Sequence, residues 1–398
     1  MIRPAEIGVV MNKSVLFRDD KLYKAFPDLA MSGDGCLICI YRESLCHGWR
    51  PFSRIIVHRS CDGGCTWTSG TVVHECADAG RDGGLNNPRL LSLGGDSLLL
   101  ICDWIPPNEP ETTPDSTIYL WRSRDGGVSW SPREGTGIKG LICPWLTKTR
   151  SGTILLGAGR YDGLNHLHID ELFLSRDDGH TWEGPVEISS SRSLDPNEGS
   201  FVELDSGALV CYMREDEERN CAYKSISKDG GKTWEGPYPT HLSCCYGRPK
   251  AGVLRSGEVA VVYGFQRFTP PRNLILHVES QETAADPKCL ERPHDGTSPR
   301  YFFIDHDRSI HPDGAYSGWV QLPSGDLYVV QYITDDAPMA HIRSYRIERH
   351  DYLLCPEGTL ANTRPWATMT YHELAREASE EQYRKNLRQR SGKPDNAL

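Results

Sequence analysis

Short apolar runs alternate with turn-forming residues along most of the chain, a pattern typical of a protein built from many β-strands. One phrase occurs six times, in which a turn that contains glycine is followed directly by a short apolar strand. The copies read Asp34-Gly-Cys-Leu-Ile-Cys-Ile, Gly95-Asp-Ser-Leu-Leu-Leu, Ser151-Gly-Thr-Ile-Leu-Leu, Ser206-Gly-Ala-Leu-Val-Cys, Ser256-Gly-Glu-Val-Ala-Val and Ser324-Gly-Asp-Leu-Tyr-Val-Val. Another apolar run precedes each copy, so each phrase predicts a β-hairpin.

A second phrase, S-x-D-x-G-x-[TS]-W, lies downstream of four of these hairpins. Its copies span Ser60–Trp67, Ser123–Trp130, Ser175–Trp182 and Ser227–Trp234, with 63, 52 and 52 residues between successive serines. The Asp can fix a turn by accepting backbone hydrogen bonds, the Gly can take a positive φ, and the Trp can bury its ring at the start of the next strand. Ser280 and Ser344 follow strand-like runs at similar spacing and are interpreted as degenerate copies.

Together the two phrases define a repeated unit of four strands. Six such units predict an all-β, six-bladed β-propeller over residues 1–355, whose closure leaves few open strand edges. The run Ile7-Gly-Val-Val-Met is expected to complete the last blade. Residues 356–398 form a C-terminal extension, in which Thr370-Tyr-His-Glu373 offers a capping box and predicts a helix over about 371–390. We expect this helix to pack on the propeller or on a second copy of the chain in a homo-oligomer.

The composition narrows the range of partners and compartments. The chain has 398 residues and a net charge of −10, which disfavours nucleic acid or an anionic membrane as a partner. No stretch approaches the roughly 18 apolar residues of a membrane helix. The start, Met1-Ile-Arg-Pro-Ala-Glu, lacks the apolar core of a signal peptide, so we expect a cytoplasmic protein.

The cysteines and histidines indicate neither a metal site nor a cofactor. The 14 Cys include no paired zinc-binding array, and Cys36 and Cys39 have an odd spacing that directs them to opposite faces of a strand. We therefore expect reduced, structural cysteines. The pair His166 and His168 is interpreted as unligated.

Counting eight residues back from the turn residue of each first phrase gives structurally equivalent positions, which should form a ring at the mouth of the propeller. They are Phe26, Asn87, Cys143, Glu198, Arg248 and Tyr316. A carboxylate, a guanidinium and a phenol at equivalent points are not what packing alone would select. Arg42 and Arg214 are likewise equivalent to each other, each seven residues after the glycine of its turn, and Arg272 opens a later strand.

These residues resemble the sialidase (neuraminidase) superfamily over roughly residues 20–350. The repeated hairpin resembles its Asp-box, and Asn197-Glu198-Gly-Ser-Phe-Val-Glu-Leu resembles the segment with the catalytic glutamate. Cys211-Tyr-Met-Arg214 and Arg272-Asn-Leu-Ile-Leu look like the second and third arginines of the carboxylate-binding triad. Ala315-Tyr316-Ser317 looks like the segment with the nucleophilic tyrosine.

The resemblance implies an exo-glycoside hydrolase that cleaves a terminal acidic sugar, sialic acid or a relative. Tyr316 would attack the anomeric carbon while Glu198 takes its proton, since a neutral phenol is a poor nucleophile by itself. Arginines would bind the substrate carboxylate through charge-assisted hydrogen bonds. We include Arg42, Arg214, Arg272 and Arg248 in this group.

The chain departs from the family pattern at two positions. Ala25 stands where the first triad arginine would fall, and Lys24 or Arg248 is a candidate replacement. The loop Glu43-Ser-Leu-Cys-His47-Gly-Trp-Arg lacks the acid/base aspartate of the family. His47 is the local candidate for the acid/base, with Asp28 and Asp82 in reserve at the site.

Two alternative functions stay open. One is a propeller glycosidase or polysaccharide lyase that uses His47 with Tyr316 on a uronic acid or deoxy-sugar. The other is a non-catalytic propeller that binds carbohydrate.

Overall fold

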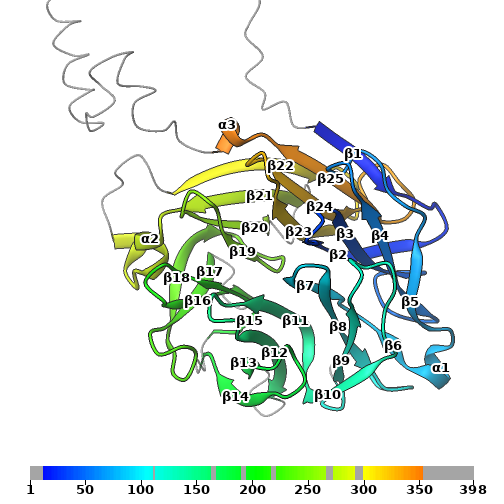
Figure 1. The fold of residues 1–398 in the computed structure, drawn as a ribbon, viewed down its shortest axis with the longest axis horizontal. Coiled ribbons are helices and arrows are strands. Elements are labelled where there is room, and N and C mark those ends of the chain that lie inside the picture. The colour runs from blue at the N-terminus through cyan, green and yellow to red at the C-terminus, as the bar shows by residue number, and fades with distance from the viewer. Residues whose placement is uncertain are drawn as a thin grey trace, which may run out of the picture.

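Six antiparallel sheets surround one axis in a computed structural model that describes residues 12–110, 113–162, 167–189, 194–216, 221–265, 272–291 and 299–352 (Figure 1). The six-bladed propeller is thereby confirmed. The predicted strand at 7–11, the extension at 356–398 and its helix lie outside the described residues.

The blades follow one another along the chain, and in each the first strand is the innermost. Blade one comprises β2 (Tyr23–Met31), β3 (Leu37–Ser44), β4 (Ser53–Ser60) and β5 (Thr71–Cys76). Blade two comprises β7 (Arg89–Gly94), β8 (Ser97–Ile105), β9 (Thr117–Ser123) and β10 (Glu134–Lys139), with the short β6 (Gly84–Leu85) also paired to β8. Blade three comprises β11 (Leu141–Lys148), β12 (Ile154–Asp162), β13 (Leu167–Ser175) and β14 (Glu183–Glu187).

The second half of the ring repeats this order. Blade four comprises β15 (Pro196–Glu203), β16 (Leu209–Glu215), β17 (Cys221–Ser227) and β18 (Glu235–Ser243). Blade five comprises β19 (Lys250–Val253), β20 (Val259–Phe265), β21 (Arg272–Glu279) and β22 (Arg300–Asp307). Blade six comprises β23 (Gly314–Gln321), β24 (Leu327–Ile333), β25 (His341–Ile347) and β1 (Asn12–Phe17). The short helices are α1 (Ala79–Asp82), α2 (Gln281–Ala285), the 3-10 turn η1 (Cys289–Glu291) and α3 (Arg349–Tyr352).

The ring closes because an N-terminal strand pairs with the last blade. In the register of β1 and β25, Ser14 lies opposite Ser344 and Asn12 lies opposite Arg346. The closing strand thus follows directly after the run that the sequence indicated. No described helix is long and apolar enough to cross a membrane.

Each of the four Asp-boxes is a turn between the third and fourth strands of its blade. In the second copy, Asp125 Oδ1 accepts the amides of Val128 and Ser129 at 3.1 and 2.9 Å, and Ser123 Oγ accepts the amide of Gly127 at 2.8 Å. Gly127 has a φ of 85°, as predicted for this position. These bonds explain the spacing of the phrase, because its Ser and Asp accept backbone donors of the turn and the hydroxyl before the Trp donates to the Asp carboxylate.

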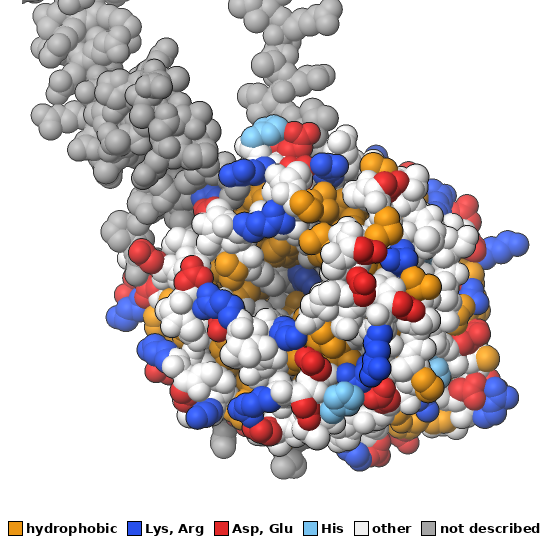
Figure 2. All heavy atoms as spheres, in the orientation of Figure 1, with side chains coloured by type: hydrophobic (Ala, Val, Ile, Leu, Met, Phe, Trp, Pro, Cys, Tyr) orange, Lys and Arg blue, Asp and Glu red, His pale blue; other side chains and the backbone are white. Residues whose placement is uncertain are grey.

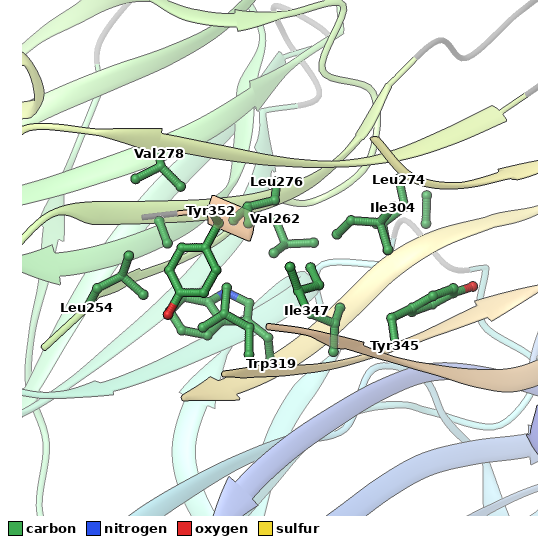
Figure 3. Packing of buried hydrophobic residues seen from close by; sticks show 14 of the residues in the cluster. Leu254, Val262, Leu274, Leu276, Val278, Ile304, Trp319, Tyr345, Ile347 and Tyr352 are labelled. Carbon is green, nitrogen blue, oxygen red and sulfur yellow. The ribbon is translucent and has the colours of Figure 1, made fainter. Parts of the chain in front are cut away.

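One apolar cluster fills each junction between neighbouring blades. Figure 3 shows the cluster between blades five and six, where Trp319, Tyr345 and Tyr352 pack with Leu276 and Ile304. Trp67, Trp130, Trp182 and Trp234 of the Asp-boxes each pack against a different junction. The boxes therefore belong to the scaffold, and they bury their rings between blades.

Two expectations about local structure are wrong. Ser344 lies inside β25, and Ser280 caps α2 by accepting the amide of Thr283, so neither begins an Asp-box turn. Cys36 and Cys61 form a disulfide, although all the cysteines were expected to be reduced. The pairing of Leu37 with Ser60 in β3 and β4 brings these two neighbours together.

Candidate active site

Three innermost strands share a β-bulge at the same level of the propeller. The register shifts between Ala25 and Asp28 in β2, between Asn197 and Ser200 in β15, and between Gly314 and Ser317 in β23. Phe26, Glu198 and Ala315 at these bulges have positive φ values of 56, 58 and 73°. This conformation is rare for residues other than glycine and is retained where a bulge re-aims side chains, often at functional sites.

The bulges of blades four and six bring the predicted nucleophile and base together. Tyr316 Oη donates a hydrogen bond to Glu198 Oε1 at 2.6 Å, across 118 positions of sequence. Arg214 Nη1 donates to the same phenol oxygen at 2.9 Å and lies 3.2 Å from Glu198 Oε1. The remaining nitrogens of Arg214 bind Asp216, with Nη2 at 2.7 Å from both carboxylate oxygens. A phenol proton thus faces a carboxylate, and the phenol oxygen faces a cation.

Arg214 keeps its charge in this buried setting. Burial alone would lower the pKa of its guanidinium, but Glu198, Tyr316 and Asp216 raise that pKa well above its ordinary value. The cation therefore favours the ionised form of whichever neighbour loses a proton. This arrangement suits a tyrosine that gives its proton to Glu198 as it attacks.

A second constellation surrounds Asp313, which sequence reasoning missed. Its Oδ2 lies 2.7 Å from His47 Nδ1 and also accepts the hydroxyl of Tyr23. Its Oδ1 accepts Arg272 Nη1 and Tyr332 Oη, both at 3.1 Å. Burial raises the pKa of Asp313, but the hydrogen bonds from His47 and Tyr23 and the charge of Arg272 outweigh burial and lower it overall. The only signal in the sequence was a carboxylate three positions before Tyr316.

The ring of Phe26 joins the two constellations. Its centroid lies 5.3 Å from that of His47 and 5.4 Å from that of Tyr316. The guanidinium of Arg42 covers the same ring at 4.7 Å. His47 and Tyr316 therefore flank one aromatic surface, which places an acid/base candidate and a nucleophile candidate in one site.

The remaining predicted arginines are buried. Arg42 donates to Asn86 Oδ1 at 3.1 Å and to the carbonyl of His47, so it supports the loop that carries His47. Arg248 is fully buried between the rings of Trp145 and Tyr316, 5.2 and 5.3 Å from their centroids. Among the residues that the structure describes, none offers a hydrogen-bond partner to its three guanidinium nitrogens.

Asp28 and Asp82, the reserve candidates, are held elsewhere. Asp28 is 1% exposed and accepts Lys250 Nζ at 2.9 Å and the amide of Leu90 at 3.0 Å, so it ties blades one, two and five together. Asp82 belongs to α1, at the edge of the ring in Figure 1, and its ion pair with Arg81 lowers its pKa to about 2. Neither contacts Tyr316 through any hydrogen bond between described residues.

Lys24, a candidate replacement for the missing arginine, is held by a carboxylate of its own blade. It forms an ion pair with Glu43, and Arg54 Nε also binds Glu43, at 2.7 Å. Ala25 itself is fully buried in β2 opposite Arg42. In blade one, Arg42 is therefore the cation that lies directly opposite the first arginine position of the resemblance.

Histidine and cysteine groupings of the described residues give no metal centre. His168 forms an ion pair with Asp195, 2.9 Å from Nδ1 to Oδ2. The one described cluster with metal-like spacing is Asp34, Cys36 and Cys61, in which both cysteines are disulfide-bonded. His166 lies outside the described residues.

The surface around the axis is hollowed. Figure 2 shows a depression at the centre of this face, with hydrophobic side chains on its walls and a Lys or Arg side chain inside. A separate cleft of about 440 Å³ adjoins the His47 loop and is lined by Cys46, Gly48, Trp49, Arg50, Asn108, Glu109 and Pro110. A larger cavity, about 680 Å³, lies between β1 and the first Asp-box, away from Tyr316.

The chain matches a known family of repeat domains in sequence. The family described as BNR repeat-like domain matches residues 54–329. No curated protein matches the chain.

Solved structures share the fold at low sequence identity. A Dyadobacter fermentans protein of unknown function is 20% identical, with a TM-score of 0.72 over 86% of this chain and 98% of that one. The Hadza microbial sialidase Hz136 is 18% identical, with a TM-score of 0.62 over 83% of this chain and 66% of its own. The intramolecular trans-sialidase from Ruminococcus gnavus is 12% identical, with a TM-score of 0.64 over 86% and 99% of the two chains. At these identities the likeness establishes the fold alone.

Proposed function

The chain belongs to the BNR repeat-like domain family, and on this premise we propose that it is a sialidase-like exo-glycoside hydrolase that releases a terminal acidic sugar. The observation that carries the proposal is the triple contact of Tyr316 with Glu198 and Arg214. A tyrosine held only for packing would not need both a carboxylate at 2.6 Å and a guanidinium at 2.9 Å from its oxygen.

In the first step, Tyr316 Oη attacks the anomeric carbon and its proton passes to Glu198 Oε1. The bond to the leaving-group oxygen breaks, and that oxygen takes a proton from His47. Because Nδ1 of His47 faces Asp313, the proton carrier is Nε2. In the second step, water attacks the same carbon, His47 accepts the water proton, and the phenolate recovers its proton from Glu198.

The charges of the site support an acidic substrate. Arg42, Arg214, Arg248 and Arg272 bring four positive charges to this region, while Glu198, Asp216 and Asp313 bring three negative ones. This cluster of four arginines lies inside a chain whose net charge is −10. A local basic group within an acidic protein is suited to a small anionic ligand.

Hydrolysis of fluorogenic glycosides tests the proposal. The panel comprises sialosides, uronides and deoxy-sugar glycosides, and the variants are Tyr316→Phe and, as a matched control, Tyr301→Phe on the outer strand β22. We expect turnover of at least one glycoside, a loss of about 10³-fold or more in Tyr316→Phe, and no change in the control. Unchanged turnover in Tyr316→Phe would exclude the mechanism. Glycan binding without product release would instead support a binding module.

A further inference from the structure

Two of the four arginines expected to bind a substrate carboxylate already hold carboxylates of the protein itself. Arg272 Nη1 binds Asp313 Oδ1 at 3.1 Å, and Arg214 Nη2 binds both oxygens of Asp216 at 2.7 Å. At the first position of the triad, Ala25 carries no charge.

Asp313 is the key member of this arrangement. Four donors from three blades converge on it: Tyr23 and His47 on Oδ2, and Arg272 and Tyr332 on Oδ1. Its side chain is still 22% exposed, so a negative charge lies at the surface of the site beside His47. The lowered pKa of Asp313 keeps that charge in place near neutral pH.

A sugar bound for attack by Tyr316 has its reacting carbon at the phenol oxygen, between Tyr316 and the acid/base on the other side of Phe26. A carboxylate on that same carbon that binds Arg214 and Arg272 would compete with Asp216 and Asp313 for them. Arg272 would need to exchange Asp313 for it, and the displaced or adjacent Asp313 would repel it. The protein's own carboxylate thus occupies the place that an acid group on the reacting carbon would require.

We propose that Asp313 excludes ketosidic acids such as sialic acid, and that the sugar released at this site carries hydrogen, not a carboxylate, on its reacting carbon. The acid group of the substrate is then attached elsewhere on the ring, as in a uronic acid. This inference rests on the proposed function, because it assumes that Tyr316 marks the reacting carbon.

The inference is tested by measuring, with calorimetry, the affinity of the protein for two probes that it cannot hydrolyse. The probes are free N-acetylneuraminate, with its carboxylate on the reacting carbon, and the methyl ester of the same sugar. Wild-type protein should bind the acid no more tightly than the ester. Asp313→Asn, which frees Arg272 and removes the negative charge, should gain at least tenfold in affinity for the acid and stay within twofold for the ester. Asp115→Asn is the control, since Asp115 is exposed and pairs with Lys139 on an outer strand.

Tighter binding of the acid than of the ester by wild-type protein would overturn the inference, and so would the absence of a gain in Asp313→Asn. If that variant does not fold, the wild-type comparison alone decides. The outcome is separable from the proposed function. Tyr316-dependent hydrolysis of a sialoside would uphold the glycosidase and overturn this inference, whereas a lack of all hydrolysis would leave the binding ratios readable.

Discussion

His47 Nδ1 lies 2.7 Å from Asp313 Oδ2, although 266 positions separate the two residues in sequence. His47 comes from the loop between β3 and β4 of blade one, and Asp313 directly precedes β23 of blade six. The contact therefore exists only because the propeller closes. It fixes the orientation of an imidazole whose side chain is otherwise 56% exposed.

This relationship predicts different losses for different leaving groups. His47→Gln should lower kcat/KM by about 10²–10⁴-fold for a glycoside with a poor leaving group, which needs a proton from the acid. It should have little effect with a nitrophenol leaving group, which departs without one. Steady-state rates on a matched pair of glycosides measure the ratio, and His350→Gln, an exposed histidine in α3, is the control. An equal loss on both glycosides would assign His47 a purely structural role.

Asp313→Asn should produce a milder version of the same signature. The amide can still accept the imidazole N–H but no longer stabilises its cation, so the poor leaving group should again be affected more. The pH dependence of kcat/KM should also change in this variant. A loss of folded protein alone would lower kcat/KM by the same factor at every pH. An unaltered pH profile would contradict a positioning role for Asp313.

Arg248 predicts opposite effects on stability and on activity. A buried guanidinium that finds no hydrogen-bond partner among the described residues, as in Arg248, is costly, and its contacts with Trp145 and Tyr316 offset only part of that cost. Arg248→Met should therefore raise the free energy of unfolding by about 1–2 kcal/mol in urea denaturation. Activity should fall, because a cation beside Tyr316, the proposed nucleophile, is lost.

Arg343→Met is the matched comparison for Arg248. Arg343 is equally buried but binds Asp305 and Asp335, at 3.1 and 2.7 Å. Its removal should destabilise the fold by about 1.5–3 kcal/mol, because Asp305 and Asp335 each lose a charged hydrogen bond, although Lys13 still binds Asp305 and Arg308 still binds Asp335. An equal loss of stability in Arg248→Met and Arg343→Met would contradict the prediction that the buried Arg248 guanidinium is costly to the fold.

The scaffold could be predicted from sequence because its signals are local. Each Asp-box satisfies its own backbone within a few residues, so four copies set the register of the whole chain. That register also placed Glu198 and Tyr316 at equivalent levels, and the structure brings them to 2.6 Å. Both inferences needed only spacing along the chain.

The missed features depend on contacts that spacing does not encode. The residue types of Phe26 and Glu198 do not predict a positive φ, since neither is glycine or asparagine. Asp313 was missed because its partners come from three blades. The disulfide was missed because Cys36 was weighed only against Cys39, whereas strand pairing brings it to Cys61.

The disulfide predicts a redox-dependent stability. It closes a segment of 25 residues within blade one, which should stabilise the fold by about 3 kcal/mol through the unfolded chain. Urea unfolding with and without a reductant measures the difference, with Cys36→Ser as the reference that should not respond. Alkylation of denatured, non-reduced protein should label two fewer of the 14 cysteines than after reduction. Complete labelling without a reductant would contradict the bond.

Asp170 predicts a pH dependence of folding that can be traced to the bulge that carries Glu198. Its carboxylate is buried in β13 and accepts the amide of Gly199, next to Glu198, at 2.8 Å. Burial raises its pKa from 3.8 to about 7, although the bond from Gly199 and the charge of His168 act in the opposite direction. The folded protein therefore holds a proton that the unfolded chain releases near pH 4.

A raised pKa of this kind stabilises the fold fully below about pH 4, and the stabilisation is lost as the pH rises to about 7. The loss amounts to about 4 kcal/mol for a shift of roughly three pKa units. Asp170→Asn keeps an acceptor for Gly199 but does not titrate. Between pH 4 and pH 7.5, the unfolding free energy of wild type should therefore fall by that amount relative to that of the variant. Urea titrations at both pH values, with Asp115→Asn as the exposed control, measure it. Parallel pH profiles for wild type and Asp170→Asn would show that Asp170 has no such role.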